Sequence, residues 1–261
     1  MFTIATWNIN SVRLREGLVA RLLREERPDI LCLQECKSPV DKIPLTQFQE
    51  LGYHHMVARG QKGYNGVAIL SRLPIVDAGD RDYAALGHAR HVAARLDNGV
   101  VIHNMYIPAG GDIPDPDANL KFRQKLDFVA EMRDVFHADR PERSIMVGDF
   151  NIAPLEDDVW SHKQMLKIVS HTPVEVAALS DAQDAGKWVD VTRQDIPDGK
   201  LYSWWSYRAR DWDVSDRGRR LDHIWATPDI ATAAHGSRIL RPVRGWDQPS
   251  DHVPVFASFD L

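Results

Sequence analysis

The chain has 261 residues, of which 44% are hydrophobic and 26% are charged, and its formal net charge is −5. This composition is sufficient for one large buried core and argues against disorder, so we expect a single domain over residues 1–261. The negative net charge argues against nonspecific coating of nucleic acid, but it is compatible with a locally basic cleft.

The cysteines and the apolar runs indicate the cellular compartment of the protein. Cys32 and Cys36 are the only two cysteines, and the N-terminus carries no secretory pattern. No apolar run approaches the roughly 20 residues that span a bilayer. We therefore expect a reduced, cytoplasmic protein with no membrane role.

Two amphipathic segments are predicted to be helices. Ser11 is a candidate N-cap for a helix that runs to Glu26, with an apolar leucine stripe, and Pro28 ends it. A second helix is predicted over residues 119–137, with apolar residues on one face. Its basic residues are assigned to the solvent-exposed face: Lys121, Arg123 and Lys125.

Short apolar runs between the helices are predicted to be strands. In chain order the candidates are residues 2–8, 30–35, 66–71, 91–97, 100–107, 144–149, 201–207, 221–226 and 253–259. Asn98 and Gly99 form a two-residue hairpin turn between the fourth and fifth candidates. Because hairpins are mixed with helical crossovers, we expect an α/β fold in which two mixed sheets pack face to face with helices outside.

Polar side chains lie at the ends of several of these strands. The run SIMVGDFN delivers Asp149 and Asn151 to its far end. The equivalent residues on the other candidate strands are Asn8, Asn10, Glu35, Tyr106, Asp251 and His252. If the strands lie side by side, these groups converge at one edge. Carboxylate and amide oxygens suit a hard divalent cation, so the pattern predicts a metal-assisted hydrolytic site.

Eight sequence strings occur in order along essentially the whole chain: TWNINSVR, LCLQECK, GYNGVAILSR, NMYIPAG, GDFNIAP, LYSWWSYR, RLDHIWAT and SDHVPVF. Together they resemble the exonuclease III-like abasic-site endonucleases of the endonuclease/exonuclease/phosphatase superfamily. The resemblance implies a four-layer α/β sandwich. It also implies divalent-metal hydrolysis of phosphodiesters in duplex DNA, by incision 5′ to abasic sites, by trimming of 3′ ends, or by both, in base-excision repair.

The resemblance also implies roles for the strand-end residues. Glu35, Asn8 and Asp251 are the expected ligands of Mg²⁺, for which Mn²⁺ is a potential substitute. Asp149 is expected to orient or deprotonate the attacking water, and Asn151 to donate a hydrogen bond to a nonbridging phosphate oxygen.

Further catalytic residues are implied in the same way. His252, held by Asp251, is expected to stabilise the phosphate, with proton transfer as its alternative role. The hydroxyl of Tyr106 is expected at the phosphate or at a metal-bound water, and Asp222 near the leaving group and the metal. His223 is interpreted as structural.

Binding of the damaged strand is assigned to other segments. Arg13, Lys37, Tyr64 and Asn65 match positions at which relatives contact the DNA backbone. A flipped abasic sugar needs a small apolar pocket, for which the candidates are Trp204 and Leu221. Trp212 is a candidate wedge in the base stack, and Trp205 is assigned to the core.

Two positions depart from the family pattern. Ala109 stands where close relatives often carry a phosphate-binding amide, and Arg219 where they often have an aromatic or apolar pocket wall. The arginine could fill the gap in the duplex or shift the preference from abasic sites to 3′ ends. Duplex DNA with abasic sites or recessed 3′ ends is the expected partner of a monomeric enzyme. The alternatives are a small-molecule phosphatase or phospholipase of the same superfamily, and a noncatalytic DNA-binding module.

Overall fold

The computed structural model describes all residues from 1 to 261 and consists of two six-stranded sheets packed face to face. The first sheet has the order β11-β12-β1-β2-β4-β3 and the second the order β5-β6-β7-β8-β10-β9. The strands of the first sheet are β1 (Phe2–Asn8), β2 (Ile30–Gln34), β3 (His55–Arg59), β4 (Val67–Ser71), β11 (Ala234–Ile239) and β12 (Val255–Phe259). Those of the second are β5 (Ile75–Gly79), β6 (His91–Leu96), β7 (Val101–Tyr106), β8 (Ser144–Asp149), β9 (Val189–Asp190) and β10 (Asp222–Ala226).

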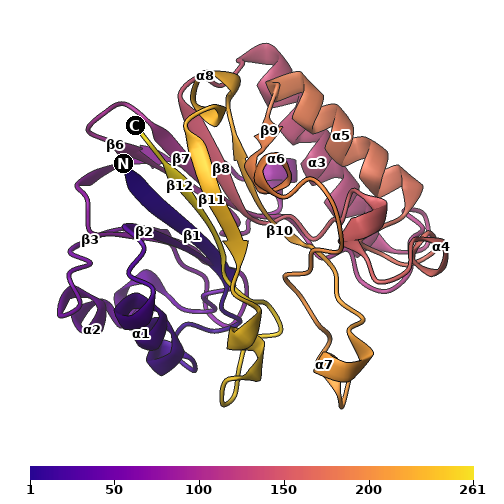
Figure 1. The fold of residues 1–261 in the computed structure, drawn as a ribbon. Coiled ribbons are helices and arrows are strands. Elements are labelled where there is room, and N and C mark those ends of the chain that lie inside the picture. The colour runs from indigo at the N-terminus through magenta and orange to yellow at the C-terminus, as the bar shows by residue number, and fades with distance from the viewer.

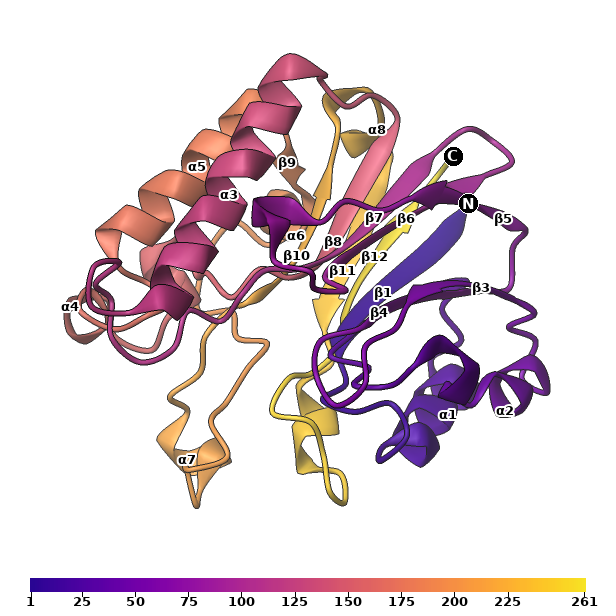
Figure 2. The same cartoon turned by 180° about the vertical axis from the view of Figure 1, so that it is seen from behind.

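Helices cover the outer faces of both sheets (Figures 1 and 2). Helices α1 (Glu16–Glu25) and α2 (Leu45–Gln49) lie on the first sheet, and α3 (Leu120–Ala138) and α5 (Pro173–Gly186) on the second. The shorter helices are α4 (His162–Met165), α6 (Val191–Asp195), α7 (Trp212–Ser215) and α8 (Pro228–Ala231). Four layers result, as predicted. None of these helices combines the length and apolar character needed to cross a membrane.

The core lies in three layers that follow from strand alternation. Alternate residues of β1, such as Phe2 and Ile4, face the second sheet, while Ala5 and Trp7 face α1 and α2. Side chains from β8 divide in the same way, because successive residues of a strand point to opposite faces. The central strands are therefore buried on both sides.

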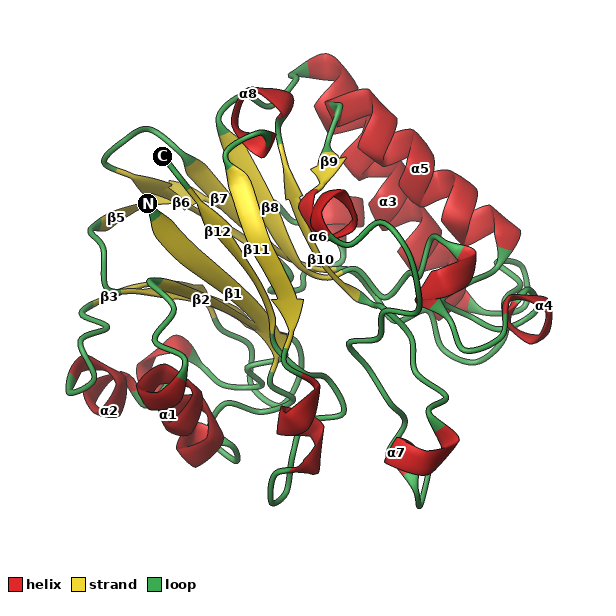
Figure 3. Ribbon diagram, viewed as in Figure 1, coloured by secondary structure: helices red, strands yellow, loops and turns green.

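Both sheets contain parallel pairs whose ends meet at one edge. Strands β1 and β2 are parallel neighbours in the first sheet, and β7 and β8 are parallel neighbours in the second. Their carboxyl ends therefore lie at the same edge of the sandwich, at the lower centre of Figure 3, near the arm that carries α7. Strand β10 runs antiparallel to β8 and begins at that edge, with Asp222 paired to Asp149.

Several sequence predictions need correction. The first helix begins at Glu16 and not after Ser11, because Asn10 and Ser11 have positive φ and turn the chain before the helix starts. Residues 201–207 form no strand, and Trp204 makes only isolated bridges to Arg219 and His252. Strands β3, β5, β9 and β11 and the long helix α5 were not predicted. The hairpin at Asn98 and Gly99 and the second long helix are confirmed.

Candidate active site

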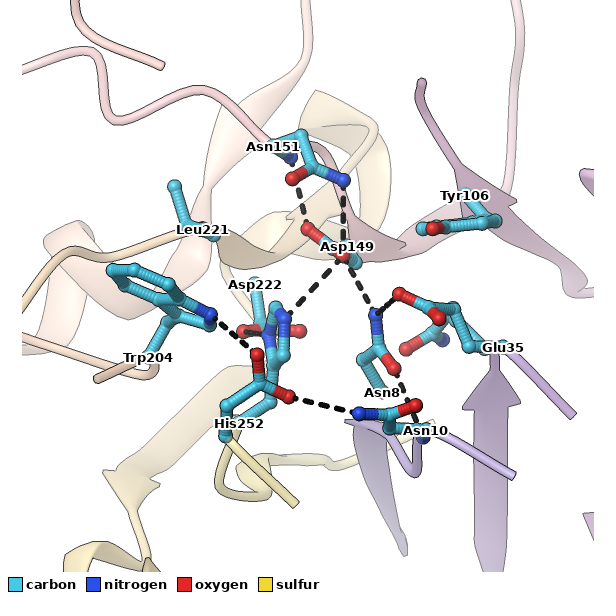
Figure 4. A network of polar contacts seen from close by, with 12 residues as sticks. Asn8, Asn10, Glu35, Tyr106, Asp149, Asn151, Trp204, Leu221, Asp222 and His252 are labelled. Atoms are coloured by element: carbon cyan, nitrogen blue, oxygen red, sulfur yellow. Dashed lines mark hydrogen bonds and ion pairs between the residues drawn. The ribbon is translucent and has the colours of Figure 1, made fainter. Parts of the chain in front are cut away.

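A polar cluster occupies the edge at which the strands end (Figure 4). Asp149 is the last residue of β8, Asn8 the last of β1, and Glu35 follows β2. A side chain at position 148 would place its Cβ 1.9 Å from the carbonyl oxygen of Met105, so only glycine permits this approach of β7 and β8. The sequence prediction that these distant segments converge is therefore confirmed.

Asp149 is buried and surrounded mainly by neutral donors. Its Oδ1 accepts the backbone N–H of Asn151 at 2.9 Å, and its Oδ2 accepts the amide nitrogen of Asn8 at 2.8 Å. The Nε2 of His252 lies 3.7 Å from Oδ2. Burial raises the pKa of Asp149 to about 7; His252 opposes this shift, whereas nearby Asp222 adds to it.

Asp222, and not Asp251, holds His252. The Nδ1 of His252 is 2.8 Å from Oδ2 of Asp222, which corrects the predicted pairing with Asp251. Burial opposes the charged imidazole, but the carboxylates of Asp222 and Asp149 outweigh it and raise the pKa of His252 to about 10. The imidazole is therefore a cation at neutral pH, held between two buried acids.

Asp251 instead orients two other side chains. Its Oδ2 accepts the indole N–H of Trp204 at 2.9 Å, and its Oδ1 accepts the amide of Asn10 at 3.4 Å. Asn10 in turn accepts a hydrogen bond from Lys37 at 2.6 Å. Asp251 thus connects the wall of the cavity to the polar cluster at the end of β1.

Glu35 and Asn8 form the other side of the cluster. One oxygen of Glu35 accepts the amide of Asn8 at 3.0 Å, and the other lies 2.7 Å from Nζ of Lys37. Burial alone would raise the pKa of Glu35, but Lys37 and the hydrogen bonds from Asn8 and Tyr106 lower it. Asn8 bridges Glu35 and Asp149 through its nitrogen while its oxygen accepts from Asn10. Ligation of a metal by Asn8 would therefore require its amide to rotate.

Tyr106 ends β7 beside Glu35. Its phenol lies against Glu35, and the guanidinium of Arg90 covers its ring at 4.5 Å. Burial raises the pKa of Tyr106 well above its ordinary value, so the hydroxyl keeps its proton. Arg90 also donates to the carbonyl of Tyr106 at 3.1 Å, a positioning contact that no sequence signal indicated.

The polar cluster opens into a cavity of about 310 Å³. Trp204 and Leu221, the predicted pocket residues, line it together with Arg219, and Figure 4 shows Trp204 and Leu221 on the side of the cluster away from Glu35 and Tyr106. The guanidinium of Arg219 lies 4.8 Å from the centre of the Trp204 ring and donates to Ser170 Oγ at 2.9 Å. Arg219 therefore forms part of the cavity wall beside Trp204.

The other predicted DNA contacts are distributed over several surfaces. Lys37, Tyr64 and Asn65 line an adjoining depression of about 620 Å³ beside Glu35. Arg13 is exposed and lines neither hollow. Trp212 also lies outside the cavity, with its ring packed edge-on against Trp205 at 5.3 Å. Its predicted action as a wedge would require it to leave this contact. Trp205 belongs to the core, as predicted.

Lys125 is the clearest residue that sequence reasoning misplaced. It was assigned to the exposed face of the second helix, but its side chain is fully buried and pairs with Glu175 of α5. Its ammonium also donates to the carbonyls of Asn151 at 2.7 Å and Ala109 at 3.3 Å. Lys125 thus fixes two loops of the cavity from behind. The nearby His223 bonds the carbonyl of Ile152 at 2.9 Å and is structural, as predicted.

The donor set fits a hard divalent cation. Asp149, Asp222 and His252 offer ligand atoms within 4.8 Å of one another, and Oδ1 of Asp222 is buried without a hydrogen-bond partner. The charged His252 is unsuited to ligation, whereas carboxylate oxygens suit a hard divalent cation. Glu35 and Asp251 line the same cavity and offer further carboxylates. A bound cation would compensate the negative charge of these buried carboxylates.

Two packed mixed sheets with a carboxylate-rich, imidazole-bearing cavity at one edge define an α/β sandwich whose site is suited to a divalent cation. Residues 5–252 match the Endonuclease/Exonuclease/phosphatase family, and the chain belongs to this family. The family and the fold predicted from the sequence are confirmed.

Individual relatives are similar to this chain over almost their full length. The chain is 27% identical to exodeoxyribonuclease III of Haemophilus influenzae, with 97% of this chain and 98% of that protein covered. Its structure is similar to that of an AP endonuclease from Archaeoglobus fulgidus, with a TM-score of 0.92, 32% identity and complete coverage of both chains. A 3′ phosphatase from Neisseria, solved with a product DNA hairpin, gives a TM-score of 0.90 at 34% identity, again over both complete chains.

Proposed function

We propose that this protein is a Mg²⁺-dependent DNA phosphodiesterase of the exonuclease III type that acts in base-excision repair. It removes nucleotides or blocking groups from 3′ ends of duplex DNA, and it incises 5′ to abasic sites as a weaker activity. The observation that carries the proposal is one cavity that is lined both by Asp149 and His252 and by Trp204, Leu221 and Arg219. A cleavage centre and a nucleotide-sized receiving pocket are thereby combined.

The catalytic residues divide the reaction between them. Asp149 orients the attacking water and accepts its proton, for which a pKa raised to about 7 is well placed. The cationic His252 stabilises negative charge on the phosphate, and Asp222 keeps it charged and oriented. Tyr106 donates its retained proton toward the phosphate. Bound by Glu35 and Asp251 with Asn8 nearby, Mg²⁺ would supply Lewis-acid charge neutralisation.

Asn151 has a role that depends on rearrangement. Its amide nitrogen donates to Oδ2 of Asp149 and to the carbonyl of Ile107, each at 3.0 Å. Both protons are therefore in use, and Asn151 acts first by holding Asp149. When substrate binds, one of these hydrogen bonds is exchanged for one to a phosphate oxygen.

Arg219 favours 3′ ends over abasic sites. Burial lowers its pKa to about 10, so it remains charged at neutral pH and carries this charge in the cavity wall. A 3′-terminal phosphate would complement that charge, since guanidinium pairs strongly with phosphate oxygens. An uncharged abasic sugar gains no such contact and must share the space with the arginine.

A direct comparison of substrates tests the proposal. Labelled duplexes carrying a 3′-phosphate, an unmodified recessed 3′ end or an internal tetrahydrofuran abasic analogue are incubated with Mg²⁺, with Mn²⁺ or with EDTA. We expect metal-dependent 3′ processing to exceed nicking 5′ to the analogue. No reaction on any duplex would reject a nuclease, and nicking faster than 3′ processing would reject the assigned preference.

Inositol phosphates and phospholipids serve as the rival substrates. Turnover of either at rates above those for DNA would favour a small-molecule phosphatase or phospholipase of the same family. DNA binding without metal-dependent cleavage would favour a noncatalytic module. We further propose that the protein acts as a cytoplasmic monomer, which light scattering of the purified chain and fractionation of its source cells would test.

A further inference from the structure

A second groove, of about 660 Å³, continues from the catalytic cavity. The two hollows share Asp112, Ile168, Trp204 and Arg219 in their linings. Neither Asp149 nor any other member of the catalytic cluster lines the second groove. The two hollows therefore adjoin each other at Trp204 and Arg219.

The groove runs between two segments distant in sequence. One wall comes from the segment around α4, including Trp160 and Met165, and the other from the arm that carries α7, including Ser206, Arg208 and Arg217. This arm extends away from the sheets at the edge where the strands end (Figures 1 and 3). An elongated ligand leaving the cavity would therefore be enclosed from two sides.

The lining alternates aromatic rings and arginines. The guanidinium of Arg217 lies 4.7 Å from the centre of the Trp160 ring, as that of Arg219 does at 4.8 Å from Trp204. Met165 and Ile168 complete the apolar floor. Stacked indole and guanidinium planes present flat surfaces to a nucleobase, which is how sequence-independent single-strand sites are built.

The groove is positively charged although the chain is not. Arg208, Arg217 and Arg219 line it, and Asp112 is its only acidic lining residue. Arg208 and Arg217 form no ion pair with any carboxylate, unlike Arg123 and Arg133 on α3. Within a protein of net charge −5, this local excess points to an anionic ligand with planar groups.

We propose that this groove binds unpaired nucleotides on the 3′ side of the cleaved phosphate. Their bases stack against Trp160 and Arg217, and their phosphates pair with Arg208 and Arg217. The inference rests on the proposed function, because the cleaved phosphate must lie at Asp149 and His252. The enzyme is then not limited to a single terminal nucleotide, since a single-stranded 3′ tail can pass through the cavity into the groove.

Equilibrium binding in EDTA tests the groove without catalysis. Fluorescence anisotropy compares a blunt duplex with the same duplex carrying a short unpaired 3′ tail. The tail should tighten binding to the wild-type protein. Trp160→Ala should remove roughly five- to a hundredfold of that gain, and Trp160→Phe, which keeps a ring, should remove less. Binding of the blunt duplex should not change in either variant.

Salt dependence provides a readout that a purely structural effect would not change. Arg217→Met should reduce the slope of log affinity against log salt by about 0.7 for the tailed duplex, because one phosphate contact on a single strand is lost. Arg133→Met, an exposed arginine on α3, is the control for lost charge. Trp246→Ala is the control for a half-buried tryptophan beneath an arginine, since Arg21 lies 4.1 Å above its ring.

The outcomes separate the two proposals. If the blunt duplex binds but the tail adds no affinity, or if the Trp160 and Arg217 variants match their controls, the groove proposal is overturned while the proposed function stands. If no duplex binds at all, the proposed function is rejected, and the groove proposal that rests on it is rejected with it. A tail-dependent gain lost in Trp160→Ala and retained in Trp246→Ala supports the groove.

Discussion

Asp149 and Asp158 are both almost completely buried carboxylates, yet the charges of their neighbours shift their pKa values in opposite directions. Asp158 accepts paired hydrogen bonds from Arg220 at 2.8 Å and is also bound by Arg193. Burial alone would raise its pKa, but the two arginines outweigh burial and lower it. Asp149 has amide donors and one imidazole, with Asp222 and Glu35 nearby, and its pKa is raised.

The difference separates a structural carboxylate from a catalytic one. Two cations already satisfy Asp158, so its charge helps to hold the loop after β8 to β10. The charge of Asp149 is only partly compensated, which costs stability but keeps the carboxylate available for a proton and for a cation. A buried carboxylate can therefore be structural or catalytic, and the charges of its neighbours determine which.

Substitution of Asp149 should have the largest effect on turnover. Asp149→Asn removes the proton acceptor, while the new amide oxygen can still accept the hydrogen bond from Asn8. We expect kcat on a 3′-end substrate to fall by roughly 10²- to 10⁴-fold. Because the lost charge is a poorly compensated one, thermal unfolding should show unchanged or higher stability. DNA affinity should be retained. A near-normal kcat would remove Asp149 from the mechanism.

The same substitution at Asp158 should have the opposite outcome. Asp158→Asn leaves Arg220 with Asp190 as its one carboxylate partner and removes the acid that pairs with the buried Arg193. We expect a loss of about 3–5 kcal/mol in the free energy of unfolding. Any fall in activity should follow the unfolded fraction. Equal stability of Asp158→Asn and Asp149→Asn in urea titration would abolish the contrast between the two sites.

The pH dependence of stability provides a further test of the role of Asp158. A carboxylate whose pKa is lowered on folding contributes its full stability above the unfolded pKa of about 3.9, and this contribution is lost as pH falls through the folded pKa. The difference in stability between wild type and Asp158→Asn should therefore be constant near neutral pH and shrink in acid below that value. A difference that grows in acid would contradict the assigned direction.

The sequence could predict the catalytic edge because strand ends are local features. LCLQE and GDFN each show an apolar run with a carboxylate at its end, and the structure places Glu35 and Asp149 accordingly. The partner of His252 could not be read in this way. Asp222 reaches it only because β10 pairs with β8 in the register that puts Asp222 opposite Asp149, whereas Asp251 is merely adjacent in sequence.

Lys125 was misplaced for a related reason. A lysine on an amphipathic helix is usually solvated, and helical periodicity says nothing about an acid arriving from another helix. Glu175 lies on α5, an element the sequence analysis did not predict. Likewise, segment 201–207 has strand-like composition but lies at the rim, where Trp204 makes only isolated bridges. Long-range pairing, and not local propensity, decides these positions.

Removal of Glu35 should affect the metal more than the chemical step. Glu35→Ala takes away one carboxylate from a cluster suited to Mg²⁺, so the Mg²⁺ concentration for half-maximal cleavage should rise by about tenfold or more. At saturating Mg²⁺ much of kcat should return, in contrast to Asp149→Asn. Arg133→Ala, at an exposed position on α3 away from the cavity, provides a control. An unchanged Mg²⁺ titration would exclude Glu35 as a ligand.

Replacement of Arg219 should have the smallest effect on hydrolysis itself and the most specific effect on substrate choice. Arg219→Trp removes the cation from the cavity wall and supplies the aromatic surface that an abasic sugar prefers, while Asp149 and His252 are untouched. Removal of a 3′-phosphate should slow and nicking 5′ to a tetrahydrofuran site should hold or rise, so their ratio shifts toward nicking. Arg219→Lys, which keeps charge but loses the planar stack on Trp204, should move the ratio less. An identical ratio in all three proteins would show that the charge on this wall does not select the substrate.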